Sequence, residues 1–274
     1  MSNVTDQDLK NQLLQDHKAS DIKKTKFPTE IIDLPSKGLV YPEGNPLASG
    51  KIEMKYMTAR EEDILTSQNL IKQGVVLDKL FQSLIVSPIN YNDLIVGDKN
   101  AIMIAARVLG YGKNYNTEIE CTECEHKNKT TIDLSTVNEK EVDPSKYTKG
   151  QNSFSFELPI SKRKVTYKVL THSDEQNIDQ ELKSNKKLSN SDVNRELSTR
   201  LKYIITSVDG NTDKNFIRNF VDDELFAQDS RALREHMKSV SPDVDLVFDF
   251  TCTSCGHQAQ LAIPVDVGFF WPRA

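Results

Sequence analysis

The sequence predicts an α+β fold in which two similar strand-helix units each end in a β-hairpin with a CxxC turn. All four cysteines fall into two such pairs, Cys121/Cys124 and Cys252/Cys255. Strand-like segments flank both pairs, at 117–120 and 129–134 and again at 246–250 and 258–263. At an offset of 131 residues the two pairs coincide and Asp98 falls on Asp229. The chain therefore reads as a diverged internal duplication.

The two CxxC pairs together predict one zinc-ribbon-like site. Each CxxC turn directs two sulfur atoms toward one point, and four thiolates suit a tetrahedral zinc ion. Four sulfur ligands leave no open coordination position, so we expect a structural site and not a catalytic one. Ribbon sites usually separate their pairs by about 15–20 residues, whereas 127 residues lie between Cys124 and Cys252. A shared metal therefore requires the fold to bring the two hairpins together.

Other roles for the cysteines are less consistent with their surroundings. A thioredoxin-like redox pair opens a helix, whereas strands flank both pairs here. Disulfides are disfavoured because no apolar signal segment begins the chain. His126 and His257 each follow a pair by two residues. They could act as ligands, but with four thiolates present we expect them to face solvent or to hydrogen-bond a sulfur.

Composition restricts the class of protein. The hydrophobic content of 37% and charged content of 27% suit a folded chain with a core in one large or two small domains. No stretch approaches the roughly 20 apolar residues of a membrane span. A net charge of −5 argues against broad binding to nucleic acid and favours protein contacts.

The first half is organised as an arm followed by a strand-helix unit. Residues 1–28 are polar and predict a flexible N-terminal arm, and residues 29–135 form the first unit. A period-two strand at 51–57 leads into a helix that Thr58 and Glu61 cap as a capping box. Further helices are expected at 75–86 and from an N-cap at Asp98 to Leu109, where glycines follow.

The second half repeats this order after a polar linker at 136–152. The second unit, 153–274, begins with a hairpin of 154–158 and 164–170 and continues with two or three helices over 172–240. The chain closes with Phe269-Phe270-Trp271, and these aromatic residues either fill the chain's own core or dock on a partner.

Several segments together resemble a known family. They are Leu34-Pro35-Ser36-Lys37-Gly38 with Tyr41-Pro42, the junction Met57-Thr58-Ala59-Arg60-Glu61-Glu62, the turn Cys252-Thr253-Ser254-Cys255-Gly256-His257, and the closing Phe269-Phe270-Trp271-Pro272. In this order they are similar to the T4-type bacteriophage baseplate protein family, whose named members are baseplate hub or hub-assembly proteins. The resemblance covers about residue 29 to the end. The zinc prediction rests on the cysteines themselves.

The resemblance implies a non-enzymatic component or assembly factor of a contractile-tail baseplate. Such a protein is made in the cytoplasm of the infected bacterium and contacts other baseplate and tail proteins, and whether it forms an oligomer there stays open. The alternative is a cytoplasmic zinc-ribbon adaptor or regulator that binds nucleic acid. That alternative requires a basic face beside a knuckle, whereas four glutamates lie around the first pair, at 118, 120, 123 and 125.

An enzymatic role is not expected. The acidic run Glu61-Glu62-Asp63 is the one cluster that suggests a hydrolase. No nucleophile-base pair or open metal position accompanies it. Acidic side chains in a first helical turn favour the helix dipole, which is the simpler interpretation.

Overall fold

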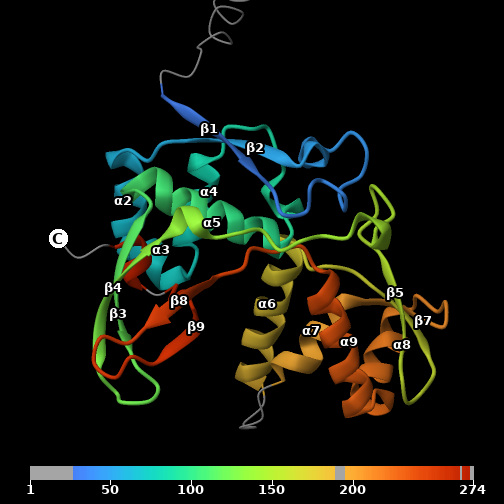
Figure 1. Cartoon of the computed structure of the whole chain (residues 1–274). Coiled ribbons are helices and arrows are strands. Elements are labelled where there is room, and N and C mark those ends of the chain that lie inside the picture. The colour runs from blue at the N-terminus through green and yellow to red at the C-terminus, as the bar shows by residue number, and fades with distance from the viewer. Residues whose placement is uncertain (1–26, 189–194, 266, 272–274) are drawn as a thin grey trace, which may run out of the picture.

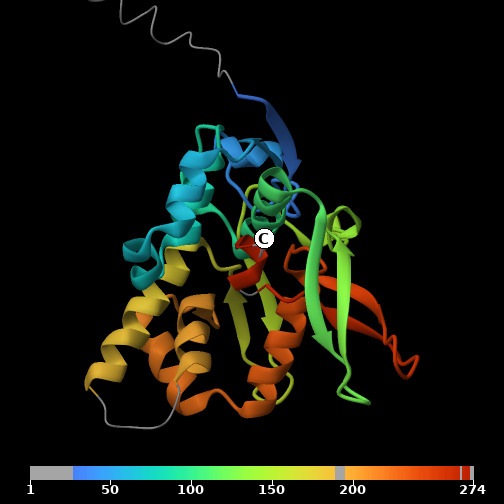
Figure 2. The same cartoon turned by 90° about the vertical axis from the view of Figure 1, so that its left-hand side faces the viewer.

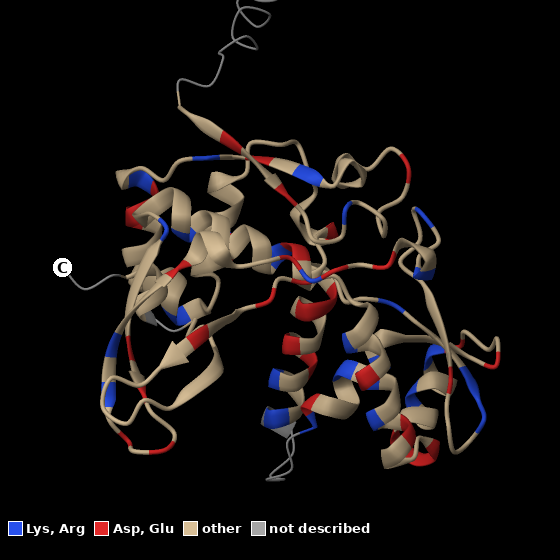
Figure 3. Ribbon diagram, in the orientation of Figure 1, with Lys and Arg blue, Asp and Glu red and all other residues tan. Residues whose placement is uncertain are grey.

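Two groups of helices lie beside small antiparallel sheets, and two hairpins extend next to each other from the same side of the molecule (Figure 1; Figure 2). The computed structural model describes residues 27–188, 195–265 and 267–271. The predicted arm at 1–28 thus lies outside the described residues except for its last two. None of the described helices is long and apolar enough to cross a membrane. Lysine, arginine, aspartate and glutamate are interspersed along the ribbon (Figure 3).

The described part of the first half, residues 27–135, contains two short strands, four α-helices and a long hairpin. In chain order these are β1 (Thr29–Asp33), β2 (Lys51–Lys55), α2 (Ala59–Thr66), α3 (Gln68–Gln73), α4 (Val76–Leu84), α5 (Val96–Tyr111), β3 (Asn114–Glu120) and β4 (Lys127–Asp133). β1 pairs with β2, and β3 pairs with β4, both antiparallel. Gly74 adopts a left-handed conformation and separates α3 from α4.

Within residues 153–188, 195–265 and 267–271, the second half contains a three-stranded sheet, five α-helices, a π-helical turn and a second hairpin. In chain order its elements are β5 (Phe154–Glu157), β6 (Lys164–Tyr167), α6 (His172–Leu188), α7 (Glu196–Ile204), β7 (Ile205–Val208), α8 (Lys214–Asn219), a π-helical turn (Phe220–Glu224), α9 (Ala227–Val240), β8 (Val247–Thr251), β9 (Gln258–Ala262) and α10 (Val267–Phe270). The sheet order is β5-β6-β7, and β8 pairs with β9. The predicted hairpins 154–158/164–170 and 246–250/258–263 are confirmed within two or three residues.

The capping box predicted at α2 is confirmed. The backbone N–H and the hydroxyl of Thr58 both donate to Glu61 Oε2, at 3.0 and 2.6 Å. Lys55 also donates to Glu61 Oε1 at 2.8 Å, and the carboxylate is fully buried. The start of α6 has the same arrangement, in which Thr171 and Lys168 donate to Asp174.

Asp98 is not the N-cap that the sequence analysis expected. α5 begins earlier, at Val96, so that Asp98 lies in the first turn. Its buried carboxylate accepts hydrogen bonds from the N–H and hydroxyl of Ser36 and from the Tyr41 hydroxyl, at 2.6 to 2.9 Å. Asp98 therefore anchors a loop from a distant part of the chain instead of capping the N-terminus of α5.

The matching residue Asp229 anchors a matching loop. It lies in the first turn of α9 and accepts from the N–H groups of Ile160 and Ser161 at 2.7 and 3.0 Å. The two loops each contain a lysine in the left-handed region, Lys37 with φ 50° and Lys162 with φ 58°. A buried aspartate in a first helical turn thus anchors a loop in each half.

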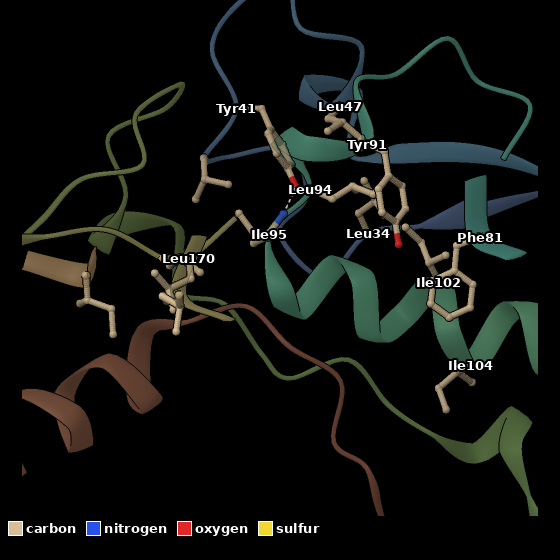
Figure 4. Packing of buried hydrophobic residues seen from close by; sticks show 14 of the residues in the cluster. Leu34, Tyr41, Leu47, Phe81, Tyr91, Leu94, Ile95, Ile102, Ile104 and Leu170 are labelled. Carbon is tan, nitrogen blue, oxygen red and sulfur yellow. Dashed lines mark hydrogen bonds between the residues drawn. The ribbon is translucent and has the colours of Figure 1, made fainter. Parts of the chain in front are cut away.

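The two halves share one hydrophobic core. Its buried members include Leu34, Phe81 and Ile102 of the first half and Tyr167 and Leu233 of the second. Figure 4 shows part of this cluster around α5, with Leu170 of the second half among the residues drawn. The boundaries proposed for separate units at 135 and 153 stay a prediction.

The aromatic terminus is part of this core. Phe269 and Phe270 are 0% and 1% exposed. Phe269 packs edge-on against Tyr115 at 5.1 Å between ring centroids, and Phe270 contacts Phe81 at 6.0 Å. Trp271 is half-buried, and its Nε1–H donates to the Leu65 carbonyl at 3.1 Å. Of the two interpretations of this segment, core filling is therefore the one that the structure shows.

Replacing Glu61 by glutamine should lower stability by about 1–3 kcal/mol and weaken its dependence on pH. Burial raises the pKa of Glu61, but hydrogen bonds from Lys55, Thr58 and Ser83 lower it to about 2. Because this is below the ordinary pKa of 4.5, the carboxylate stabilises the fold above pH 4.5, and that contribution is lost as the pH falls toward 2.

Urea unfolding at about pH 7 and about pH 3 measures the effect. The wild type should lose more stability between these pH values than the Glu61→Gln variant does. The exposed neighbour Glu62 provides a control, because Glu62→Gln should follow the wild type. Parallel profiles for the wild type and Glu61→Gln would contradict the assignment.

Candidate metal centre

The two CxxC turns have nearly the same backbone. In the first, the Cys121 N–H donates to the His126 carbonyl at 2.9 Å and the Glu125 N–H donates to the Cys121 carbonyl at 2.9 Å. In the second, the corresponding bonds join Cys252 with His257 and Gly256 with Cys252, at 2.8 and 3.1 Å. The residue after each second cysteine has positive φ, 57° at Glu125 and 73° at Gly256. This conformation favours glycine, so the second turn is the less strained of the two.

The fold brings all four cysteines together. Their Sγ atoms lie within 4.8 Å of one another. Across the two turns, the Sγ atoms of Cys121 and Cys255 are 3.8 Å apart, and those of Cys124 and Cys252 are 3.7 Å apart. Four sulfurs bound at about 2.3 Å around a tetrahedral ion would be about 3.8 Å from one another. The observed spacing thus fits a zinc ion held jointly by both turns.

Burial divides the four cysteines into an inner and an outer pair. Cys121 and Cys252, the first of each pair, are 1% and 2% exposed and pack with the buried Phe250. Cys124 and Cys255 are exposed. The site therefore lies at the end of the two hairpins, with one sulfur of each turn against a small apolar cluster and the other toward solvent.

The two thiols of the second turn differ in their pKa. The N–H of Cys255, together with that of Ser254, lowers the pKa of Cys252 to about 6. A backbone bond from His257 lowers the pKa of Cys255, but its contacts with the other three thiols raise it to about 12. The Cys252 thiolate thus forms more readily than that of Cys255, and a metal ion binds cysteine as the thiolate.

The histidines stand apart from the sulfur cluster. Among the described residues, the group of clustered ligand atoms consists of the four cysteines. His126 is exposed and His257 is half-buried, and each binds its own turn through its backbone carbonyl. Among the described residues, the histidine ring nitrogens thus do not belong to the group of atoms that could hold a metal ion, whereas the four sulfurs do.

Asn128 joins the two turns, and the sequence analysis did not single it out. Its side chain is buried in β4, and its Oδ1 accepts from the N–H and hydroxyl of Thr253, both at 2.8 Å. Its Nδ2 donates to the His126 carbonyl at 2.9 Å and faces the sulfur of Cys252 at 3.7 Å. The available signal was an asparagine within a strand, where this residue type is disfavoured unless its amide is bonded.

The acidic run that the sequence analysis considered lies elsewhere. Glu61 is engaged with Lys55, Thr58 and Ser83, whereas Glu62 and Asp63 are exposed on α2. The structure does not place the run among the cysteines.

Comparison with known proteins shows the family. The model of the T4 bacteriophage base plate protein family matches residues 29–271, which is most of the chain. No curated protein and no solved structure matches the chain. The matched region includes both CxxC turns, both sheet-and-helix groups and the aromatic terminus. The chain therefore belongs to the T4 bacteriophage base plate protein family.

Proposed function

We propose that the chain is a structural or assembly component of a baseplate hub, that it acts through contacts with other tail proteins, and that one zinc ion ties its two halves together. The observation that carries the proposal is the convergence of four thiols from two hairpins. Four sulfurs saturate a tetrahedral zinc ion, so the metal holds structure and does not act on a substrate. Membership in the baseplate family supports the baseplate as the assembly in which the protein acts.

We further propose that the two halves are a diverged duplication whose knuckles form a zinc-ribbon-like unit. The recurring features support this: the Lys55–Glu61 and Lys168–Asp174 ion pairs, both at 2.8 Å, and the buried aspartates that anchor one loop each. α4 and α7 also have nine residues each. Each of these helices is followed by an isoleucine that pairs with the neighbouring strand.

A non-catalytic role is consistent with the position of the acidic run. Glu61 is fully buried and bonded on both oxygens, so its carboxylate stabilises the start of α2 and has no route to a substrate. The sites of function are then the surfaces that meet other tail proteins.

Replacing Asn128 by alanine should weaken zinc binding by about 10- to 100-fold. The amide holds the second turn in position through Thr253 and directs an N–H toward Cys252. A competition titration with a chromophoric chelator measures the affinity, and cobalt absorption reports the geometry of the site. Asn116→Ala is the control, because Asn116 is exposed on the neighbouring strand. Equal affinity for Asn128→Ala and the wild type would show that the amide has no role in orienting the ligands.

The baseplate role is tested by following the protein through tail assembly. Residues 1–26 of the predicted arm at 1–28 are one expected contact element, so a chain lacking them should bind one zinc, remain folded and fail to join baseplate assemblies. Co-purification with mature particles would identify a resident component, whereas recovery with intermediates alone would identify an assembly factor. Normal assembly without the protein, or binding to nucleic acid in place of tail proteins, would contradict the proposal.

A further inference from the structure

The two halves of the chain meet through a short antiparallel contact. Residues 94–96, which lead into α5, form the acceptor segment, and residues 170–172, which lead into α6, form the docking segment. Ile95 pairs with Thr171 across this contact. Ile95 is only 1% exposed. Figure 4 shows Ile95 and Leu170 at this junction.

Two backbone hydrogen bonds hold the segments together. The Val96 N–H donates to the Leu170 carbonyl at 3.2 Å, and the His172 N–H donates to the Leu94 carbonyl at 2.7 Å. Both donors belong to first turns of helices, where N–H groups lack partners within the helix. The contact thus provides acceptors for the first N–H groups of both α5 and α6.

The second half contains a matching acceptor segment that is open. Residues 225–227 lead into α9 as 94–96 lead into α5. Each segment ends two positions before a buried aspartate, Asp229 or Asp98. The N-caps have similar conformations, φ −74° and ψ 157° at Ile95 and φ −62° and ψ 147° at Phe226. Phe226, however, is 54% exposed. Leu225 lines an apolar hollow of about 350 Å³ together with Leu197 and Leu201.

The first half contains a matching docking segment that is also open. Residues 57–59 lead into α2 as 170–172 lead into α6, and Thr58 matches Thr171 in its capping contacts. Ala59 is exposed, whereas its counterpart His172 is 3% exposed. Among the described residues, no backbone hydrogen bond outside the helices is made by the Ala59 or the Ala227 N–H.

We propose that residues 57–59 of a second copy of the chain dock on residues 225–227, repeating the contact that each chain makes internally. Thr58 of one copy then faces Phe226 of the other. The Ala227 N–H donates to the Met57 carbonyl, and the Ala59 N–H donates to the Leu225 carbonyl. The two surfaces differ from each other, so the association is head-to-tail and builds an open chain of subunits or a closed ring. The inference goes beyond the proposed baseplate role and does not depend on the metal.

Two substitutions remove one surface each without disturbing the fold. Phe226→Asp places a charge in the acceptor surface, and aspartate is a favoured N-cap, so α9 should keep its start. Ala59→Pro removes the donor N–H of the docking surface. Proline is tolerated at the first position of a helix, and the preceding Thr58 is already extended, with φ −122° and ψ 173°.

Sedimentation of the full zinc-loaded chain over a concentration series tests the proposal. The average mass of the wild type should rise with protein concentration. The series extends to about 1 mM, so that a contact with a Kd in that range is still detected. Either variant alone should self-associate with a Kd at least about tenfold higher than that of the wild type. Ile31→Asp is the matched control, because Ile31 is 68% exposed on β1 and should leave association unchanged.

Mixing the two variants provides the decisive result. Each retains the surface that the other lacks, so an equimolar mixture should form a dimer that does not grow. A wild type that stays monomeric would overturn the proposal. So would association that survives Phe226→Asp, or a mixture of variants that remains monomeric. Circular dichroism and zinc content confirm that each variant is folded.

Discussion

Replacing Cys252 by serine should abolish zinc binding and leave the chain insoluble or sensitive to protease. Zinc binding contributes on the order of 10 kcal/mol to the folding of small metal-dependent peptides. Here the proposed site links residues 131 positions apart, and Cys252 is buried beside Phe250. Without the ion, up to four thiols remain crowded at the end of two hairpins. We expect the loss of several kcal/mol, which is a large part of a typical stability of about 5–15 kcal/mol.

Elemental analysis and thermal unfolding measure both parts of this prediction. The wild type should contain close to one zinc per chain and should lose stability when a strong chelator removes it. The Cys252→Ser variant should contain none and should not respond to the chelator. Thr122→Ala, in an exposed position of the first turn, is the control and should retain zinc and stability. A Cys252→Ser variant with an unchanged Tm would show that the site is peripheral to folding.

Replacing Phe270 by alanine should destabilise the fold by about 3–5 kcal/mol, the usual cost of emptying a buried phenylalanine position. Its ring is 1% exposed and packs among Phe81, Phe269 and Trp271. Trp271→Ala should cost less, because that side chain is only half-buried and makes one hydrogen bond to Leu65.

Urea unfolding of these variants distinguishes a core role from a docking role. Ile31→Ala removes a side chain that is 68% exposed and should change stability by no more than about 0.5 kcal/mol. If Phe270→Ala kept the stability of the wild type and lost only the binding of tail proteins, the terminus would be a docking element and its burial would not matter for folding.

Local features of this protein could be predicted because they depend on neighbouring residues. The hairpins around the cysteines follow from strand-forming segments on both sides of a short turn. The start of α2 follows from Thr58 and Glu61, which bond each other across one helical turn. The resemblance to the baseplate family likewise rested on short segments, and the family match confirms it.

Contacts between distant segments could not be obtained in this way. Asp98 looked like a helix cap because aspartate favours that position, whereas its carboxylate binds Ser36, 62 residues away. An asparagine in a strand is the one local signal at Asn128, and it does not identify the partner, because Thr253 lies 125 residues further along the chain.

The sequence by itself determined the four cysteines, the strands around them and the order of the helices, since turn geometry, residue periodicity and capping act over a few residues. Only the tertiary structure decided that the two turns meet with a spacing suited to one metal ion and that Phe269 and Phe270 fill the core. It also decided that the acceptor segment at 94–96 is covered, whereas Phe226 in its counterpart at 225–227 is exposed. These outcomes depend on how the whole chain packs its apolar surface, and packing selects contacts by shape and position in space and not by distance along the sequence.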